Sequence, residues 1–145
     1  DELWLKSKTQ VMGYLNTSMD SFTKDGWFKT GDLVKTTDDG YLKIIGRNKE
    51  VINVGGEKVL PIEIESIILS MDEIEDVIVY GEDNRITGQI VVADIVPVKD
   101  IEARKAKSLV RTYCKDKIDR YKLPTKVNIV DKTNFGDRFK KMRRN

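Results

Sequence analysis

The sequence predicts an α+β fold: a small sheet with two packed helices, preceded by an all-β segment. Residues 1–46 contain short apolar runs and turn signals, which are typical of β-strands. Two later stretches, near residues 61–71 and 100–119, repeat apolar residues at helical spacing. From residue 50 onward, the order hairpin, helix, strand, strand, helix, strand suits two helices on one face of a sheet.

The all-β segment is expected to begin with short strands marked by Leu3, Leu5 and Val11. The stretch LVKTTDDGYLKII then places apolar runs on either side of Asp-Asp-Gly at positions 38–40. Because a glycine-containing turn between two such runs is a hairpin signal, two paired strands are predicted here.

The second part opens with a predicted hairpin over residues 50–59, in which Gly55 and Gly56 supply backbone freedom at positive φ. A helix is predicted directly after it. Pro61 suits the first helical turn, because its missing N–H needs no partner there. The stripe that this helix buries, at positions i, i+3, i+4 and i+7, comprises Ile64, Ile67, Ile68 and Met71.

The remaining elements are two strands, a second helix and a last strand. The runs DVIVYG and GQIVVADIV predict the two strands. The helix is predicted over about residues 100–119, and Pro124 precedes the final strand, KVNIV, which leads into a polar, loop-like tail. The stripe that this second helix buries comprises Ala106, Leu109, Val110, Tyr113 and Cys114.

The composition narrows the class of protein. Hydrophobic residues make up 39% and charged residues 34% of the 145 positions, as in soluble globular proteins. The net charge of +2 is too small to indicate nucleic-acid binding. The absence of histidine excludes His-based catalysis, and the single cysteine, Cys114, excludes an internal disulfide and a zinc site of several cysteines. No apolar run has membrane-spanning length, and a cytoplasmic location is expected.

Three clusters have the spacing of a functional site. The first is Gly31-Asp32 within DGWFKTGDL, where two aromatics run into a glycine and a lone acid. The second is GRNKEVINVGGEKVLPIEIE, residues 46–65, and the third is the basic loop around Lys140. Taken singly, each has an ordinary structural explanation: a turn or cap, a hairpin and a solvated tail.

Taken together, the clusters resemble one family, the AMP-forming adenylating enzymes, which include acyl- and aryl-CoA synthetases, peptide-synthetase adenylation domains and luciferases. The motifs that carry the resemblance are, in order, DELWLKSKTQVMGYLN, GWFKTGDL, GRNKEVINVGGEKVLPIEIE and RYKLP, and the resemblance extends over nearly the whole chain. The resemblance implies that residues 1–48 are the end of a large N-terminal domain and that residues 49–145 are a mobile C-terminal α+β domain.

The resemblance also implies the nucleotide-binding residues. The Thr-Gly-Asp carboxylate of the family binds the two ribose hydroxyls of ATP, and this role falls on Asp32, with Thr30 beside the nucleotide. A carboxylate suits a cis-diol because it offers two acceptor oxygens and no competing donor. Arg47 corresponds to an arginine that contacts the ribose and phosphate region. Lys49 occupies the hinge about which the small domain rotates between two half-reactions.

A different segment is implied for the second half-reaction, in which a thiol attacks the acyl-adenylate. Gly55, Gly56, Glu57 and Lys58 would swing towards the active site, and Gly56 would line the pantetheine tunnel, where a side chain would obstruct the thiol arm. An ordinary hairpin turn is the structural alternative. No metal ligand is assigned to this chain, because Mg²⁺ would arrive with ATP and bind mainly through phosphates and upstream carboxylates.

The adenylation lysine of the family follows a glycine near the C-terminus, but here Gly136 precedes Asp137. An alignment on that glycine would delete the catalytic lysine. Counting without gaps from Pro124 instead gives Lys140, with an arginine three positions later, so Lys140 is the favoured catalytic residue. Its role would be electrostatic, bridging carboxylate and α-phosphate oxygens as negative charge develops. Lys141 is one position out of register.

The leading hypothesis is therefore part of an ATP-dependent ligase that activates a carboxylic acid as an acyl-adenylate and passes it to the thiol of CoA. The expected partners are ATP and AMP, a fatty, aromatic or amino acid, CoA and the missing N-terminal domain, without which the full reaction is not expected. Transfer to the pantetheine of a carrier protein is the alternative within the family. Asp137 motivates a second alternative, a binding module that has lost its chemistry. RNA binding ranks lowest, because no pair of exposed aromatics on neighbouring strands is evident.

Overall fold

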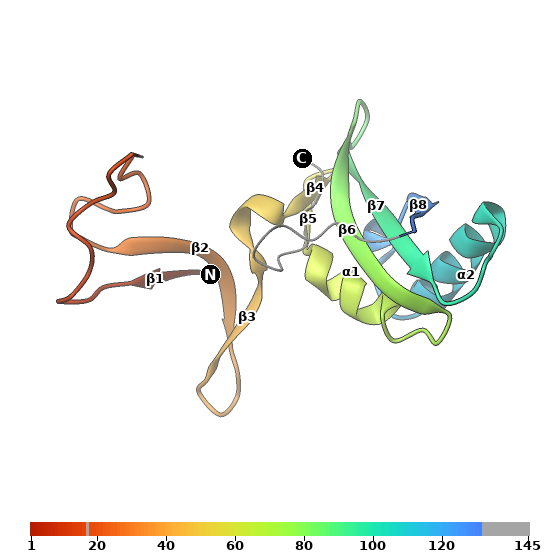
Figure 1. Cartoon of the computed structure of the whole chain (residues 1–145), viewed down its shortest axis with the longest axis horizontal. Coiled ribbons are helices and arrows are strands. Elements are labelled where there is room, and N and C mark those ends of the chain that lie inside the picture. The colour runs from red at the N-terminus through yellow and green to blue at the C-terminus, as the bar shows by residue number, and fades with distance from the viewer. Residues whose placement is uncertain (17, 132–145) are drawn as a thin grey trace. The chain divides into compact units, whose positions relative to one another are not determined.

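The computed structural model describes residues 1–16 and 18–131, and the chain divides into two compact units, Asp1–Lys49 and Glu50–Asn145 (Figure 1). Each unit contains its own sheet. The assignment of the first unit to a large domain and of the second to a mobile one stays a prediction.

The first unit is a three-stranded antiparallel sheet in the order β1-β2-β3. The predicted hairpin is confirmed, and Gly40, with a φ of 85°, lies in its turn. The strand predicted around Val11 is wrong, because the chain leaves β1 through turns, one of them closed by the N–H of Thr9 donating to the hydroxyl oxygen of Ser7. The strands are β1 (Glu2–Leu5), β2 (Phe28–Thr36) and β3 (Leu42–Arg47).

The second unit contains a sheet in the order β5-β4-β7-β6, with β8 paired in parallel to β7. As predicted, the β4–β5 hairpin turns at Gly55 and Gly56, whose φ angles are 62° and 93°. The strands are β4 (Ile52–Val54), β5 (Glu57–Val59), β6 (Ile74–Asn84), β7 (Gly88–Pro97) and β8 (Lys126–Ile129). Its helices are α1 (Pro61–Ile68), α2 (Ala103–Lys115) and the short 3₁₀ segment η2 (Arg120–Lys122). Another short 3₁₀ segment, η1 (Asn48–Glu50), includes the last residues of the first unit and the first residue of the second.

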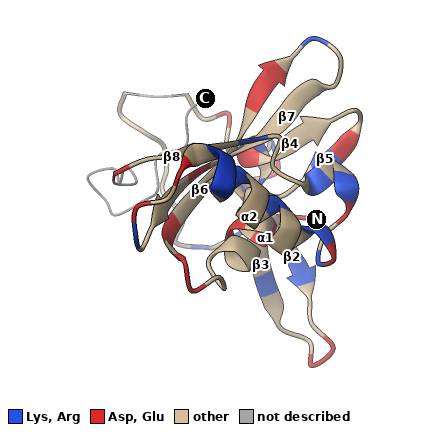
Figure 2. Ribbon diagram, turned by 90° about the vertical axis from the view of Figure 1, so that its right-hand side faces the viewer, with Lys and Arg blue, Asp and Glu red and all other residues tan. Residues whose placement is uncertain are grey.

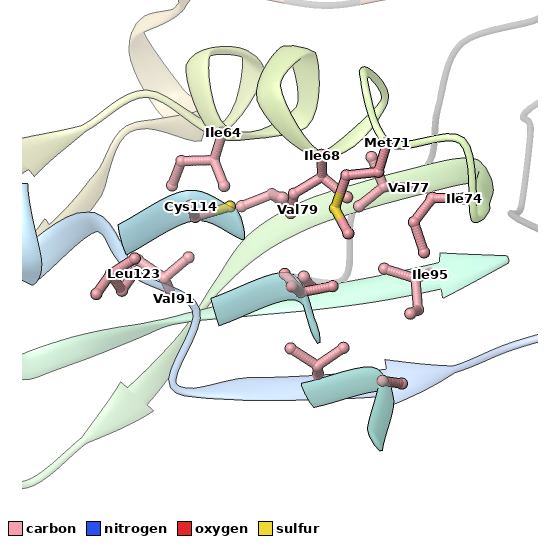
Figure 3. Close-up of a cluster of buried hydrophobic side chains, with 14 of the residues drawn as sticks. Ile64, Ile68, Met71, Ile74, Val77, Val79, Val91, Ile95, Cys114 and Leu123 are labelled. Carbon is pink, nitrogen blue, oxygen red and sulfur yellow. The ribbon is translucent and has the colours of Figure 1, made fainter. Parts of the chain in front are cut away.

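Helices α1 and α2 pack against this sheet, and the core lies between them (Figure 3). Among the described residues, every buried hydrophobic side chain belongs to the second unit. Complete burial of an aliphatic side chain stabilises the fold by about 1.5–3 kcal/mol. The packing of α1 and α2 on one sheet confirms the predicted α+β fold. The core includes Ile64 and Ile68 of α1, Ala106, Val110 and Cys114 of α2, Val77 and Val79 of β6, and Val91, Ala93 and Ile95 of β7.

Both helices end earlier than the sequence pattern predicts. Helix α2 ends at Lys115, because the backbone of Asp116 leaves the helical region, with φ −97° and ψ 4°. The N–H groups of Lys117 and Ile118 then both bond to the carbonyl oxygen of Cys114. Helix α1 ends before Met71, which is still buried because tight turns continue the chain along the same core. Apolar spacing predicts which residues are buried, and the buried residues continue past the end of the regular helix.

Charged side chains are interleaved along the elements of both units (Figure 2). Some of them form ion pairs between elements, such as Lys126 with Glu82 and Lys122 with Glu63. In the part of the chain that the structure describes, no helix has the length and apolar character needed to cross a lipid bilayer.

Candidate functional site

The Thr-Gly-Asp sequence of β2 lies in a β-bulge opposite β1. Glu2 pairs with Leu33 and Trp4 pairs with Lys29, so three residues of β2 lie opposite one residue of β1. Gly31, in the middle of the bulge, has a φ of 74°, a conformation that glycine adopts far more readily than other residues. The bulge interrupts the regular β1–β2 pairing at Asp32, the predicted ribose-binding residue.

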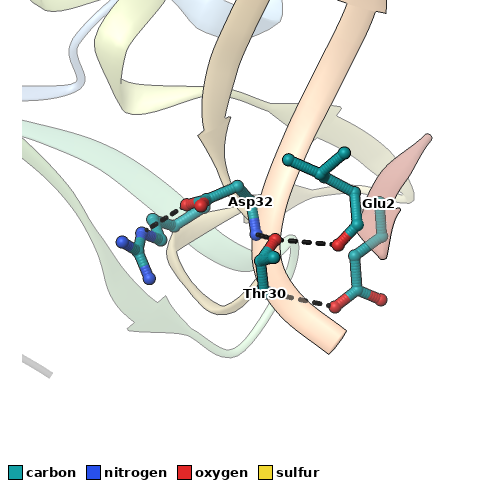
Figure 4. Close-up of polar contacts among 6 residues, drawn as sticks. Glu2, Thr30 and Asp32 are labelled. Atoms are coloured by element: carbon teal, nitrogen blue, oxygen red, sulfur yellow. Dashed lines mark hydrogen bonds and ion pairs between the residues drawn. The ribbon is translucent and has the colours of Figure 1, made fainter. Parts of the chain in front are cut away.

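Three hydrogen bonds fix the backbone of this bulge (Figure 4). The Thr30 hydroxyl donates to the carbonyl oxygen of Leu3 at 2.8 Å and accepts from the N–H of Asp32 at 3.0 Å. The N–H of Gly31 donates to Oε1 of Glu2 at 3.1 Å. Thr30 therefore supports the backbone of Asp32, and Glu2 supports that of Gly31. No spacing pattern in the sequence singles out Glu2.

Asp32 and Arg47 lie opposite each other on β2 and β3, where they are register partners. The Nε of Arg47 is 2.7 Å from Oδ1 of Asp32, and the two side chains are 41% and 18% exposed, respectively. The structure thus brings together two of the predicted nucleotide-binding residues. A carboxylate has a second acceptor oxygen and a guanidinium has further N–H donors, so the pair has additional hydrogen-bonding capacity for a polar ligand.

A hollow of about 430 Å³ adjoins the pair within the first unit. Thr30, Gly31, Arg47 and Lys49 are among the residues that line it. Asp32 is not among the lining residues; its carboxylate is bound by Arg47, whose side chain forms part of the wall. The predicted hinge residue, Lys49, therefore lies beside the predicted nucleotide-binding residues.

The predicted thiol-binding segment forms the β4–β5 turn of the second unit. Gly55, Gly56, Glu57 and Lys58 are all exposed. A Cβ added to either glycine would meet no atom of the described chain within 4 Å, so the positive φ angles, rather than crowding, explain the glycines in this structure. Asn53 stabilises the turn, because its Oδ1 accepts the N–H of Gly56 at 3.0 Å.

The predicted catalytic residue, Lys140, and its alternative, Lys141, lie outside the described residues, as do Gly136 and Asp137. Within the described ranges, no group of three or more cysteine or acidic side chains could hold a metal ion.

The RYKLP motif forms η2 and connects neighbouring elements. Lys122 Nζ lies 2.9 Å from Oε1 of Glu63 in α1 and 3.2 Å from Oδ2 of Asp119. The hydrogen bond that Lys122 donates to Glu63 is the main cause that raises the pKa of Lys122. Arg111 of α2 donates to the carbonyl oxygen of Pro124 at 2.5 Å. These contacts give the motif a structural role that its sequence alone does not reveal.

Comparison with known proteins identifies the family. The family described as the AMP-binding enzyme C-terminal domain matches residues 63–136, about half of the chain.

This chain belongs to the AMP-binding enzyme C-terminal domain family.

Curated relatives agree with this membership. The chain is 33% identical over 134 residues to the 2-succinylbenzoate–CoA ligase of Bacillus licheniformis, covering 90% of this chain and 27% of that protein. It is 37% identical over 135 residues to the oxalate–CoA ligase of Saccharomyces cerevisiae, covering 90% of this chain and 24% of that protein. The chain thus spans about a quarter of the length of these relatives.

Solved structures of the same kind share the fold. The o-succinylbenzoate CoA synthetase of Bacillus subtilis, in complex with its acyl-adenylate intermediate, matches with a TM-score of 0.83 and 29% identity, covering 97% of this chain and 28% of that chain. The ATP-bound MatB of Rhodopseudomonas palustris matches with a TM-score of 0.75 and 32% identity, covering 83% of this chain and 24% of that chain.

Proposed function

We propose that this chain supplies the ribose-binding strand pair and the mobile C-terminal domain of an ATP-dependent acid–thiol ligase. The enzyme would convert a carboxylic acid to an acyl-adenylate and transfer the acyl group to the thiol of CoA. The observation that carries the proposal is the Asp32–Arg47 pair, joined at 2.7 Å beside a hollow that Lys49 also lines. Membership of the family and relatives named as CoA ligases support it.

The geometry of the bulge suits a ribose-binding role for Asp32. Hydrogen bonds to Thr30 and Glu2 hold the backbone on both sides of the bulge, and the ion pair to Arg47 orients the carboxylate. A group held in this way loses little further freedom when it binds a ligand, so more of the interaction energy contributes to affinity. Asp32 would accept hydrogen bonds from the ribose hydroxyls, while Arg47 would contact the ribose and phosphate region.

The hinge role of Lys49 is consistent with its position. Strand β3 ends at Arg47, and the short η1 segment, Asn48–Glu50, follows before β4 begins. Hinges are a few residues at the ends of elements that absorb a large change in φ and ψ. We propose that Lys49 is that hinge, that Lys140 supplies the cation for adenylation, and that the Gly55–Gly56 turn then admits the thiol arm.

The first unit has the surface of an incomplete domain. None of its described residues belongs to the buried hydrophobic set, and the side chains of Met12 and Leu15 are fully exposed. We therefore propose that a large N-terminal domain covers this apolar surface and supplies the acid pocket and most of the contacts to ATP and Mg²⁺. This chain alone is then expected to show no pyrophosphate exchange, and measurable exchange would contradict that expectation. A cytoplasmic location remains part of the proposal.

The test of the first half-reaction is ATP–pyrophosphate exchange by the full-length protein with a panel of aromatic, dicarboxylic, fatty and amino acids. With the best acid, Asp32→Asn should lower exchange by about 10- to 150-fold, the range expected for one lost charge-assisted hydrogen bond. Asp38→Asn, in the exposed β2–β3 turn, is the matched control and should leave exchange unchanged. No exchange with any acid would contradict the proposed activity, and normal exchange by Asp32→Asn would contradict the role of Asp32.

Two lysine variants decide between the registers at the C-terminal end. Lys140→Ala should abolish most adenylation, whereas Lys141→Ala should retain it. The reverse result would assign the role to Lys141, and no effect of either would favour a binding module that has lost its chemistry. Product analysis with CoA and with a pantetheinylated carrier protein then decides which thiol accepts the acyl group.

A further inference from the structure

We propose that Gln89 is a positioning residue for thiol transfer, because it holds the Gly55–Gly56 turn through Asn53. This inference rests on the proposed function of that turn. Gln89 lies near the start of β7, and its Oε1 accepts the backbone N–H of Asn53 at 2.9 Å. Neither Gln89 nor Asn53 would touch the reactants. Both would act through the turn.

A chain of hydrogen bonds connects β7 to the turn. Asn53, fixed by Gln89, accepts the N–H of Gly56 through its own Oδ1 at 3.0 Å. The N–H of Gly55 donates to the carbonyl oxygen of Thr87 at 2.7 Å, in the loop between β6 and β7. Each glycine of the turn is therefore held by a separate hydrogen bond, and both bonds lead back to the β6–β7 hairpin.

The hairpin end that holds the turn is itself braced. The Oδ1 of Asn84 accepts the N–H of Ile86 at 2.9 Å and the N–H of Thr87 at 3.2 Å. The Thr87 hydroxyl donates to the carbonyl oxygen of Gln89 at 2.7 Å. These bonds define the position of the Thr87 carbonyl that receives Gly55, so the support for the turn is a fixed structure.

Position 81 leaves room for the Gln89 side chain. A Cβ on Gly81 would lie 3.0 Å from Nε2 and 3.1 Å from Cδ of Gln89, which is tighter than most Cβ contacts and would require the Gln89 amide to shift. Glycine at this position in β6 therefore lets the Gln89 amide lie across the strand and reach Asn53. The β4–β5 ladder closes the turn at Val54 and Glu57, but β4 pairs with β7 only between Val54 and Gly88 within the described sheet, so the Gln89 bond adds to a short backbone connection between the turn and β7.

The support matters because two adjacent glycines have unusual conformational freedom. An exposed turn without these bonds would adopt many conformations, and few of them would leave a passage for a thiol arm. A net hydrogen bond shifts such an equilibrium by about 2- to 13-fold. Loss of the Gln89 bond should therefore slow the step that uses the turn and spare the step that does not.

The test separates the two half-reactions in the full-length protein. Gln89→Met keeps the length of the side chain but removes the acceptor, whereas Gln89→Glu keeps an acceptor oxygen. Gln89→Met should slow single-turnover transfer from the acyl-adenylate to CoA by about 2- to 13-fold and leave pyrophosphate exchange within about twofold. Gln89→Glu should transfer at nearly the wild-type rate. Should Gln89→Met not fold, Asn53→Ala, with Asn53→Asp as its conservative control, removes at an exposed position the side-chain acceptor for Gly56 through which Gln89 would act, and should slow transfer in the same way.

The outcomes are distinct. Equal loss in both half-reactions, or normal transfer by the acceptor-free variants, overturns the positioning role while the proposed function stands. A wild-type protein that exchanges no pyrophosphate contradicts the proposed function and this inference with it. Slower transfer with normal exchange, restored by the conservative variants, supports both.

Discussion

Replacing Gly81 with alanine tests how tightly β6 packs against the support of the β4–β5 turn. The added Cβ would lie 3.0 Å from Nε2 of Gln89, 3.1 Å from its Cδ and 3.1 Å from Cγ2 of Ile52. Gly81 does not have a positive φ, so alanine is compatible with the backbone at this position. Any destabilisation must therefore come from these contacts rather than from backbone strain.

The expected loss of stability follows from three contributions. Overpacking a filled site costs about 1–3 kcal/mol. A shift of the Gln89 amide would also weaken its hydrogen bond to the N–H of Asn53, worth about 0.5–1.5 kcal/mol. Replacing glycine at a compatible φ returns about 0.4–1 kcal/mol through the unfolded state. Gly81→Ala should therefore lower the free energy of unfolding of the second unit by about 0.5–4 kcal/mol.

The measurement must report on the second unit alone. Both tryptophans, Trp4 and Trp27, lie in the first unit, whereas Cys114 is fully buried in the core of the second. A denaturant titration monitored by pulsed labelling of the Cys114 thiol therefore gives the free energy of unfolding of the second unit. Gly13→Ala is the control, because its Cβ would meet only the Met19 sulfur at 3.9 Å.

A double variant sharpens the test. Gln89→Ala removes two of the three close contacts, so Gly81→Ala should cost less in that background, with a coupling energy of about 1 kcal/mol. Full stability of Gly81→Ala, or strictly additive effects with Gln89→Ala, would refute the reasoning.

Three further predictions follow from single groups. Lys122→Met should destabilise the second unit by about 0.5–1 kcal/mol at neutral pH. Because the hydrogen bond to Glu63 raises the pKa of Lys122, the difference from wild type should be fully present from neutral pH up to pH 10.5 and should disappear as the pH rises through the raised pKa. A difference that persists at higher pH in denaturant titrations contradicts this. Burial raises the pKa of Cys114, so iodoacetamide should label the native chain at least about tenfold more slowly than the denatured one; equal rates measured by mass spectrometry contradict the burial. Gly31→Ala forces an alanine to a φ of 74° at a cost of about 1–2 kcal/mol, and a raised KM for ATP in the full-length protein is expected because Asp32 is displaced.

Local chemistry explains what the sequence could predict. The turn at positions 38–40 and the two glycines of the β4–β5 turn depend on residues adjacent in the chain, and both were predicted. Apolar spacing predicted the buried faces of both helices, because burial follows the helical period. The exact ends of the helices depend on how each last turn closes, which spacing does not encode.

The supports of the candidate site were not predictable in the same way. Gly31 is held by Glu2, 29 positions away in the chain, and Asn53 is held by Gln89, 36 positions away. Neither partner stands out by residue type or spacing, because glutamate and glutamine are common on surfaces. Only the arrangement of strands brings each partner to its glycine-containing turn.

The two candidate segments share one physical design. Each contains a glycine at positive φ, and each is held by a side-chain oxygen on a neighbouring strand: Glu2 binds the Gly31 N–H directly, and Gln89 acts on Gly56 through Asn53. Glycine permits a conformation that other residues rarely adopt, but its freedom makes that conformation costly to maintain. The side-chain supports offset this cost before a ligand arrives. Since the two supports lie in different units, loss of the Glu2 bond should impair adenylation, whereas loss of the Gln89 bond should impair thiol transfer.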